Sequence, residues 1–319
     1  MDISLYLNKE DGERFLIPYD FKQTFHHDSR LLQTPKEYVL VREFYVKDDE
    51  TQAIELEVLK YLRDFCFATE TQLRTLLGAK GLNPDRLTEI LDSCVKDKIV
   101  NYFALTSFVM ESIPDDAFRI YCLDHGARHI LTHFSKQDFL SWISSDNIRS
   151  SELVAKYLMT GMFYLQVLAV KSESLREFKP LADFTIGKRD IRFSAAFQIM
   201  QGFTPKDFIV EVIRHDDLPT MWRQKVNEKI APFVQQNYWN LYYRTLPVFI
   251  FLTQNDEDAF MAADIFYMRT KQDIFRVLTD KNLIKGLDVA PFYAYVPESE
   301  KNPTPMLKRV KSRIFMPET

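Results

Sequence analysis

The sequence predicts an α/β (α+β) fold in two parts, and three patterns carry this prediction. Residues 50–98 repeat apolar side chains at helical spacing, and residues 99–124 read as two strands joined by a turn. Residues 178–280 then alternate strands with helices, which is typical of a mixed sheet flanked by helices. The chain has 319 residues, of which 46% are hydrophobic, so two domains with sizeable cores are expected.

The first part has the element order of a winged helix-turn-helix domain, which we place at residues 49–134. Three amphipathic helices are followed by strands at 99–111 and 117–124. Start signals accompany the second and third helices, namely the capping-box pair Thr69 and Gln72 and the dipeptide Asn83-Pro84. The inward positions of the three helices are Ile54, Val58, Leu59, Leu62 and Phe65, then Leu73, Leu76 and Leu77, then Leu87, Ile90, Leu91, Cys94 and Val95.

Three further segments are set apart by their composition. They are an N-terminal extension at 1–48, a linker at 135–149 and a second domain at 150–319. Within the extension, residues 37–46 could be a strand or the start of a helix, and His26 and His27 are interpreted as part of a solvated loop.

The predicted helix after the second strand contains a pattern seen in winged-helix domains and three regularly spaced histidines. The stretch RIYCLDHGARHIL (119–131) resembles the strand-then-helix ending of many bacterial winged-helix domains, with Asp124 where threonine is usual. His125, His129 and His133 follow at intervals of four residues, a spacing that could bind zinc. Three ligands in a row on one straight helix make a poor tetrahedron, so an ordinary surface helix is the preferred interpretation.

Charge and composition exclude some function classes. The formal net charge is −4, which weakens bulk attraction to nucleic acid or to an anionic membrane. The chain has 8 Gly and no GxxxxGKS/T or GxGxxG run, so nucleotide binding through those loops is not supported. No cofactor is therefore predicted from these motifs.

Cysteine usage and apolar runs indicate a compartment. Cys66, Cys94 and Cys122 form no CxxC pair, and an odd count suits a reducing environment. The first residues lack the pattern of a signal peptide, and the apolar run at 158–170 is shorter than a bilayer span. We expect a cytoplasmic protein without a membrane partner.

Candidate DNA contacts lie in the winged helix and in the C-terminal tail. The third helix normally enters the major groove, but residues 84–98 are mildly acidic, which also permits a role in protein contact or dimerisation. The tail MLKRVKSRIF (306–315) is either a phosphate contact or a solvated segment with Ile314 and Phe315 on the core. The predicted DNA-binding residues are Arg74, Lys80, Arg86, Lys96, Lys98, Lys308, Arg309, Lys311 and Arg313.

The second domain contains one acid inside an apolar strand. In DFIVEVIRHDD (207–217), Glu211 stands among residues that predict burial, and a buried carboxylate is costly unless it is paired. Arg192, Arg214 and Lys225 are the candidate partners. The element order of a long helix, three strands, a helix and another strand resembles the PD-(D/E)XK nuclease core, a restriction-endonuclease-like mixed sheet.

That resemblance implies a metal site that this sequence matches only in part. Glu211 falls in the place of the E-x-K glutamate, but Ile213 stands where the lysine is expected. Ser194 or Ala195 stands where the family has its metal-binding aspartate. A single carboxylate is a poor Mg²⁺ site. A working metal site would require Asp190 or Asp183 from neighbouring strands and Lys225 from the next helix. The candidate remnant site is Glu211, Asp190 and Lys225.

The combination of both domains resembles the replication-relaxation family of Gram-positive plasmids and mobile elements. The stretches that carry the resemblance are FSAAFQI, FIVEVIRHDD, WRQKVNEKIAPF and LPVFIFLTQ, in that order. It implies a DNA-associated protein that acts in the replication, transfer or regulation of a bacterial plasmid or integrative element.

Three hypotheses for function follow. The preferred one is a non-catalytic protein that binds double-stranded DNA, with a homodimer or replication and transfer proteins as further partners. The second is a Mg²⁺-dependent DNA endonuclease with a displaced site, the one case in which a metal cofactor is expected. The third is an interaction scaffold, in which both domains are assembly surfaces. Trp222, on the predicted helix at 218–236, is expected to be a buried core residue and not a platform on which a base stacks.

Overall fold

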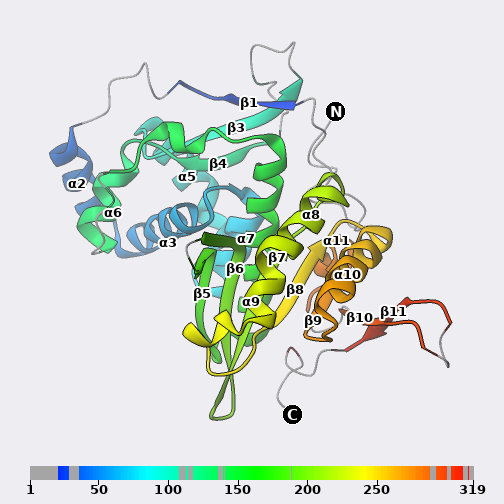
Figure 1. Ribbon diagram of the computed structural model, residues 1–319. Coiled ribbons are helices and arrows are strands. Elements are labelled where there is room, and N and C mark those ends of the chain that lie inside the picture. The colour runs from blue at the N-terminus through cyan, green and yellow to red at the C-terminus, as the bar shows by residue number, and fades with distance from the viewer. Residues whose placement is uncertain are drawn as a thin grey trace. The chain divides into compact units, whose positions relative to one another are not determined.

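A computed structural model of the protein confirms the α+β fold, and its described residues form one four-stranded and one seven-stranded sheet (Figure 1). The structure describes residues 21–28, 36–107, 113, 118–135, 139, 141–187, 189–287, 292–299, 303–311 and 315. The chain forms two compact units. Unit 1 contains the described residues up to Leu165, and unit 2 those from Gln166 onward.

Unit 1 combines helices with the four-stranded antiparallel sheet, whose order is β1-β3-β4-β2. Its elements are β1 (Phe21–Phe25), α2 (Glu37–Tyr45), α3 (Asp49–Phe65), β2 (Ala68–Thr69), α4 (Glu70–Ala79), η1 (Pro84–Arg86), α5 (Leu87–Lys96), β3 (Val100–Ser107), β4 (Ile120–Leu123), α6 (Ala127–Ser135), η2 (Ser144–Asn147) and most of α7 (Ser151–Lys171). The order from α3 to β4 is that of the predicted winged helix.

The local signals for these helices are confirmed. Thr69 and Gln72 form a complete capping box at the start of α4. The side chain of Asn83 accepts a hydrogen bond from the backbone N–H of Asp85 at the start of η1. All the apolar positions that we predicted to face inward on α3, α4 and α5 are buried. Periodicity therefore identified the helical core of unit 1 correctly.

The segment before the winged helix belongs to the same sheet. Strand β1 pairs antiparallel with β3, with Phe25 opposite Phe103, so the wing strand has neighbours on both sides. Residues 37–46, which the sequence left open between strand and helix, form helix α2 with Leu40 and Phe44 buried.

Unit 2 is built on the seven-stranded sheet, whose order is β11-β10-β9-β8-β7-β6-β5. Strands β5, β6 and β7 form an antiparallel meander, and β7, β8 and β9 run parallel. The elements are β5 (Leu175–Ile186), β6 (Arg189–Gln201), β7 (Thr204–Val212), η3 (His215–Asp217), α8 (Thr220–Lys225), the π-helical segment η4 (Val226–Ile230), α9 (Ala231–Gln235), η5 (Tyr238–Leu241), β8 (Val248–Thr253), α10 (Asp256–Thr270), β9 (Phe275–Thr279), α11 (Asp280–Ile284), β10 (Phe292–Val296) and β11 (Met306–Val310).

The helices from α8 to α10 share one apolar cluster with the sheet. Phe249 and Phe251 of β8, Phe233 of α9 and Phe266 of α10 are fully buried in it. Trp222 of α8 is 2% exposed and donates its indole N–H to the carbonyl of Ala262 at 3.1 Å, so it is a core residue, as expected.

Helix α7 contains the long apolar run of the sequence. By length and composition, Glu152–Lys171 would be able to cross a membrane, but 56% of its 18-residue apolar window is buried inside the protein. In unit 1, Leu158 and Phe163 are buried, and the Gln72 side chain donates to the carbonyl of Leu158 at 2.8 Å. These contacts are those of a core helix, as predicted for residues 158–170.

Side-chain alternation in the β5–β6 hairpin shifts by one residue near its middle. Ile191, Phe193 and Ala196 of β6 all enter the same apolar cluster, although a regular strand would turn Phe193 and Ala196 to opposite faces. The pairing register with β5 is nevertheless continuous across this point, and Leu181 of β5 has a left-handed φ of 50°. Both strands therefore contain an irregular residue there, Leu181 on β5 and Ser194 on β6.

Candidate functional site

Glu211 lies near the end of β7, between β6 and β8. It is 8% exposed, and Ile209, Val212 and Ile213 around it are almost completely buried. A carboxylate in such a place must be compensated, because its transfer from water into an apolar interior is very costly.

Lys225, the last residue of α8, supplies the compensating charge. Its Nζ lies 2.5 Å from Oε1 of Glu211 and donates to the backbone carbonyl of Arg192 at 2.9 Å. The ammonium also lies 5.2 Å from the centre of the Phe193 ring. The buried indole of Trp222 anchors the same helix, so Lys225 is held toward the strand.

Ser194 of β6 donates a hydrogen bond to the other carboxylate oxygen of Glu211. The register that pairs Ala195 with Val210 puts Ser194 directly opposite Glu211. The backbone N–H of Ser194 lies 3.3 Å from Oε2 of Glu211, and the Ser194 hydroxyl accepts the N–H of Val212 at 3.0 Å. The irregular residue of the hairpin thus serves as a donor to the carboxylate.

The remaining candidates of the remnant site lie elsewhere. Asp190 is exposed and accepts a hydrogen bond from the Thr185 hydroxyl at 2.9 Å. It is four residues before Ser194 along β6, which corresponds to about 13 Å of strand. Asp183 pairs with Arg192 at 2.8 Å. The structure therefore brings Lys225 to Glu211 but not Asp190 or Asp183.

Arg214, the third candidate partner of Glu211, forms an ion pair with a different acid. Its guanidinium forms a two-pronged ion pair with Asp280 at 2.7 and 2.9 Å, and both side chains are buried. Of the three basic residues considered for Glu211, Lys225 is the one in contact with its carboxylate.

These contacts do not fit a magnesium ion. Mg²⁺ needs an octahedron of oxygen ligands, whereas both oxygens of Glu211 face hydrogen-bond donors, from Lys225 and from Ser194. Within the part of the chain that the structure describes, no group of three or more His, Cys, Asp or Glu is arranged to hold a metal ion. The chemistry that this donor set supports is charge neutralisation.

Most of the predicted DNA contacts in unit 1 are bound to acids. Arg74 donates to Glu70 at 2.7 Å and to the carbonyl of Pro84 at 2.7 Å. Arg86 lies 3.2 Å from both Asp48 and Glu50. Lys80 lies 3.8 Å from Glu57, whereas Lys96 is exposed and Lys98 half-buried.

The outward face of α5 is acidic. Glu89 and Asp92 are exposed there, with Lys96 as the exposed base at its end, and the exposed Asp85 of η1 precedes the helix. DNA recognition by such a helix depends on cationic contacts to phosphates and guanines, so this face repels the backbone that it would have to approach.

Residues 306–310 of the basic tail form the edge strand β11 of unit 2, and Lys311 follows it directly. Lys308, Arg309 and Lys311 are exposed, and among the described residues none of them forms an ion pair. The Arg309 guanidinium lies 5.8 Å from the centre of the Tyr293 ring on β10. Phe315 is buried and stacks on Phe292 at 5.4 Å, whereas Arg313 lies outside the described residues.

His125 precedes α6 and has a partner of its own, whereas His129 and His133 of α6 share one. His133 Nε2 and His129 Nδ1 lie 2.8 and 3.5 Å from the Glu37 carboxylate of α2, and His125 Nε2 lies 3.1 Å from the Ser144 hydroxyl. They thus hold α2 and η2 in place around α6, and the contact with His133 lowers the pKa of Glu37.

The prediction for His27 was wrong. The residue was expected in a solvated loop, but its ring is largely buried and Nε2 contacts the buried carboxylate of Asp124. This pairing gives the buried Asp124, which follows β4, a partner. It could not be found in the sequence, because the two residues are 97 positions apart.

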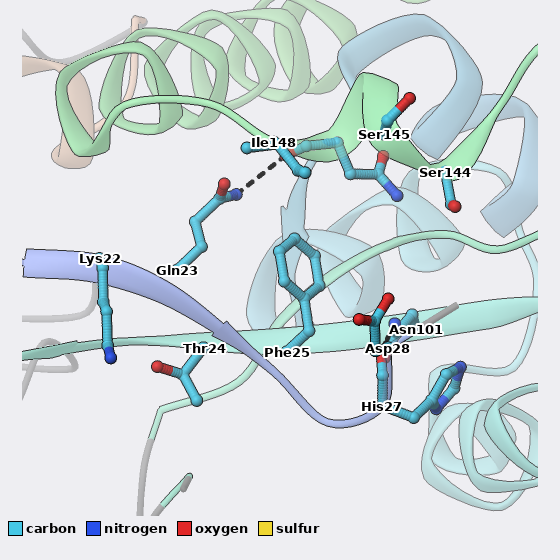
Figure 2. Close-up of a pocket in the computed structure, with 11 residues that line it drawn as sticks. Lys22, Gln23, Thr24, Phe25, His27, Asp28, Asn101, Ser144, Ser145 and Ile148 are labelled. Carbon is cyan, nitrogen blue, oxygen red and sulfur yellow. Dashed lines mark hydrogen bonds between the residues drawn. The ribbon is translucent and has the colours of Figure 1, made fainter. Parts of the chain in front are cut away.

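A small polar cavity of about 280 Å³ lies beside His27 in unit 1. Figure 2 shows Gln23 of β1 reaching toward the η2 segment, where its amide donates to the carbonyl of Asn147 at 3.0 Å. The Asn101 side chain donates to the carbonyl of His27 at 3.0 Å. These contacts tie β1 to η2 and tie the residues that follow β1 to strand β3 of the winged helix.

Comparison with known proteins gives little further information. No family model and no curated protein matches the sequence, so the resemblance to the replication-relaxation family stays a prediction. Among solved structures, restriction endonuclease FokI aligns with a TM-score of 0.27 and 12% sequence identity, over 75% of this chain and 45% of that one. This chain thus spans less than half of the length of that protein, and a likeness at this score carries no argument.

Proposed function

We propose that this is a non-catalytic, DNA-associated protein in which the metal site of a nuclease-like sheet is replaced by an ion pair. As the resemblance implies, it would act in the replication, transfer or regulation of a bacterial plasmid or integrative element. The observation that carries the proposal is the contact of 2.5 Å between Lys225 and Glu211, with a serine on the facing strand.

Catalysis by this fold would need at least two acids around one metal. Here the facing strand offers the backbone N–H of Ser194, and Asp190 is bonded to Thr185. The ammonium of Lys225 supplies the positive charge that a metal would otherwise bring to Glu211. The ion pair therefore neutralises the buried carboxylate without assembling a reaction centre.

The exposed cations of β11 and the lysine that follows it favour a DNA contact in unit 2. Lys308, Arg309 and Lys311 have no acid beside them among the described residues, so their charges are available to phosphates. The winged helix, with its acidic α5, would then contact other proteins or a second copy of the chain.

DNA binding is tested by fluorescence anisotropy of the full-length protein on a random-sequence duplex across a salt series. Three phosphate contacts predict a log–log salt dependence of about −3. The absence of binding at low salt would refute DNA association and leave the scaffold hypothesis.

Catalysis is tested by calorimetry with Mg²⁺ and Mn²⁺ and by a nicking assay on supercoiled plasmid. We expect no metal binding and no nicking, and Glu211→Gln should bind DNA like the wild type. Metal-dependent nicking that disappears in Glu211→Gln would establish the endonuclease alternative. The observation that favours this alternative is the presence of Lys225 beside Glu211, where an active site would also place a lysine.

The counter-ion role of Lys225 has a test of its own. Lys225→Met leaves Glu211 buried and unpaired, which should lower the free energy of unfolding by about 3 kcal/mol or more. The double variant Lys225→Met/Glu211→Gln should recover most of that loss in urea denaturation. If the single variant is as stable as the wild type, Lys225 does not neutralise Glu211.

The acidic face of α5 favours the interaction scaffold as a second candidate. Arg74 and Arg86 hold this part of the winged helix together through their ion pairs, and Asp85, Glu89 and Asp92 remain for a basic partner. Light scattering that shows a monomer, with no partner in a cross-linking experiment on cells, would count against it.

A further inference from the structure

A second acid lies on the same strand as Glu211, in a different environment. Asp207 of β7 is four residues earlier, hence on the same face of the sheet and about 13 Å away. It is 7% exposed and lines a cavity of about 580 Å³ in unit 2. Unlike Glu211, Asp207 forms no ion pair with any described residue.

The floor of this cavity is a row of acceptors across three strands. Glu177 of β5 pairs with Gln198 of β6, and Gln198 pairs with Asp207 of β7. Directly paired residues share a face, so the three side chains stand in line about 5 Å apart. The side-chain amide of Gln198 donates to Oδ1 of Asp207 at 2.7 Å. This leaves Oδ2 of Asp207 and the side-chain oxygen of Gln198 as acceptors.

Aromatic side chains form one wall. The segment after α9 crosses the β5 end of the sheet (Figure 1), where the Tyr242 hydroxyl binds the backbone N–H and C=O of Thr185 at 2.7 and 3.3 Å. Phe184 packs against Tyr242 at 5.0 Å and Tyr243 at 5.9 Å between ring centres. The wall is therefore fixed to the sheet by both hydrogen bonds and ring contacts.

The electrostatic environment around Tyr243 is negative. Burial raises the pKa of Tyr243, and the charges of Asp207 and Glu177 raise it further. At the rim, Asp183 is paired with Arg192, and Lys179 and Arg244 are exposed. A buried carboxylate without a cation is costly, so the cavity favours a ligand that brings positive charge.

We propose that this recess binds an alkylguanidinium group, the chemistry of an arginine side chain. A guanidinium is planar, carries five N–H donors and stacks on aromatic rings, which matches an acceptor row beside an aromatic wall. A neutral nucleobase could use the same acceptors, but it would leave the charge of Asp207 uncompensated. The guanidinium is either part of a partner polypeptide or a free small molecule.

The test uses the full-length protein and two matched probes, N-acetyl-arginine methylamide and its neutral citrulline counterpart. Binding is followed by NMR titration with ring-labelled tyrosine. The arginine probe should shift the Tyr243 signal and bind about tenfold or more tightly than the citrulline probe, because hydrogen bonds to a charged group are the stronger ones. A short Gly-Arg-Gly peptide distinguishes the sources, since tighter binding of the peptide indicates a polypeptide ligand and equal binding a small molecule.

Two variants and a control complete the experiment. Asp207→Asn keeps an acceptor for Gln198 and should weaken the arginine probe about tenfold or more. Tyr243→Phe should weaken it less, and Glu257→Gln, an exposed acid of α10 outside the cavity, should have no effect. Thermal melting verifies that each variant folds. Equal affinity for both probes, undiminished binding by Asp207→Asn, or binding of guanosine or cytidine in place of arginine would overturn the proposal.

Discussion

The two surfaces on which we expected DNA contacts use their positive charges differently. In the winged helix, Arg74, Lys80 and Arg86 each lie beside a carboxylate of the same unit. On strand β11, Lys308 and Arg309 are exposed, and no described acid lies within ion-pair distance of them. Counting basic residues in a sequence therefore does not locate a phosphate-binding surface, because what matters is whether each charge already has a partner.

The largest expected effect comes from neutralising β11. The triple variant Lys308→Gln/Arg309→Gln/Lys311→Gln should lower DNA affinity roughly a hundredfold at 0.1 M salt and reduce the salt slope by about 3. Fluorescence anisotropy across a salt series measures both quantities.

The winged helix provides a control of equal charge. Arg74→Gln/Lys80→Gln/Arg86→Gln removes three positive charges as well, but from residues that are already paired, so affinity should change little. If this variant loses more affinity than the β11 variant, the comparison is wrong and the winged helix is the DNA-binding surface.

A charge reversal on α5 should have a moderate effect on DNA affinity and tests whether acidic charge keeps this helix from DNA. Glu89 and Asp92 are exposed, so Glu89→Lys/Asp92→Lys should leave the fold intact. If acidic charge keeps this helix from DNA, the variant should bind more tightly and its salt slope should increase by about 2. An unchanged slope would mean that α5 faces away from DNA for reasons other than charge.

The smallest expected effect concerns Asp48, which caps α3 and contacts Arg86. The hydroxyl and N–H of Thr51 hold the pKa of Asp48 well below its usual range, and Arg86 lowers it further. A depressed carboxyl pKa stabilises the fold above the unfolded value of about 3.9, and this contribution is lost as pH falls through the folded pKa. Wild type should therefore melt slightly higher than Asp48→Asn at pH 7, and the difference should vanish in strong acid. A constant difference from pH 7 to pH 2 would contradict this linkage.

Patterns within short stretches of sequence predicted much of the fold. The apolar stripes of α3, α4 and α5, the capping box of Thr69 and Gln72, and the order of strands and helices in unit 2 all depend on neighbours within a few residues. Strand β1 was not predicted, because its pairing with β3 joins residues such as Phe25 and Phe103 that are far apart in the chain.

The candidate site was predictable in its parts but not in its contacts. The sequence identified Glu211 and named Arg192, Arg214 and Lys225 as its possible partners, but it could not choose Lys225 among them, and it did not predict the contact with Ser194. That choice depends on how Trp222 anchors α8 against the sheet. Asp207 was passed over because its lack of a counter-ion is visible only when the side chains of neighbouring strands are placed.

The two outer strands of the large sheet have a consequence for self-association. An outer strand exposes unpaired backbone groups that invite pairing with another chain, and lysine, proline and irregular residues discourage it. Strand β11 carries Lys308 and Arg309, and β5 carries Lys179, Pro180 and the left-handed Leu181. If the protein forms a homodimer, we therefore expect its copies to meet through side-chain surfaces and not by joining their sheets edge to edge.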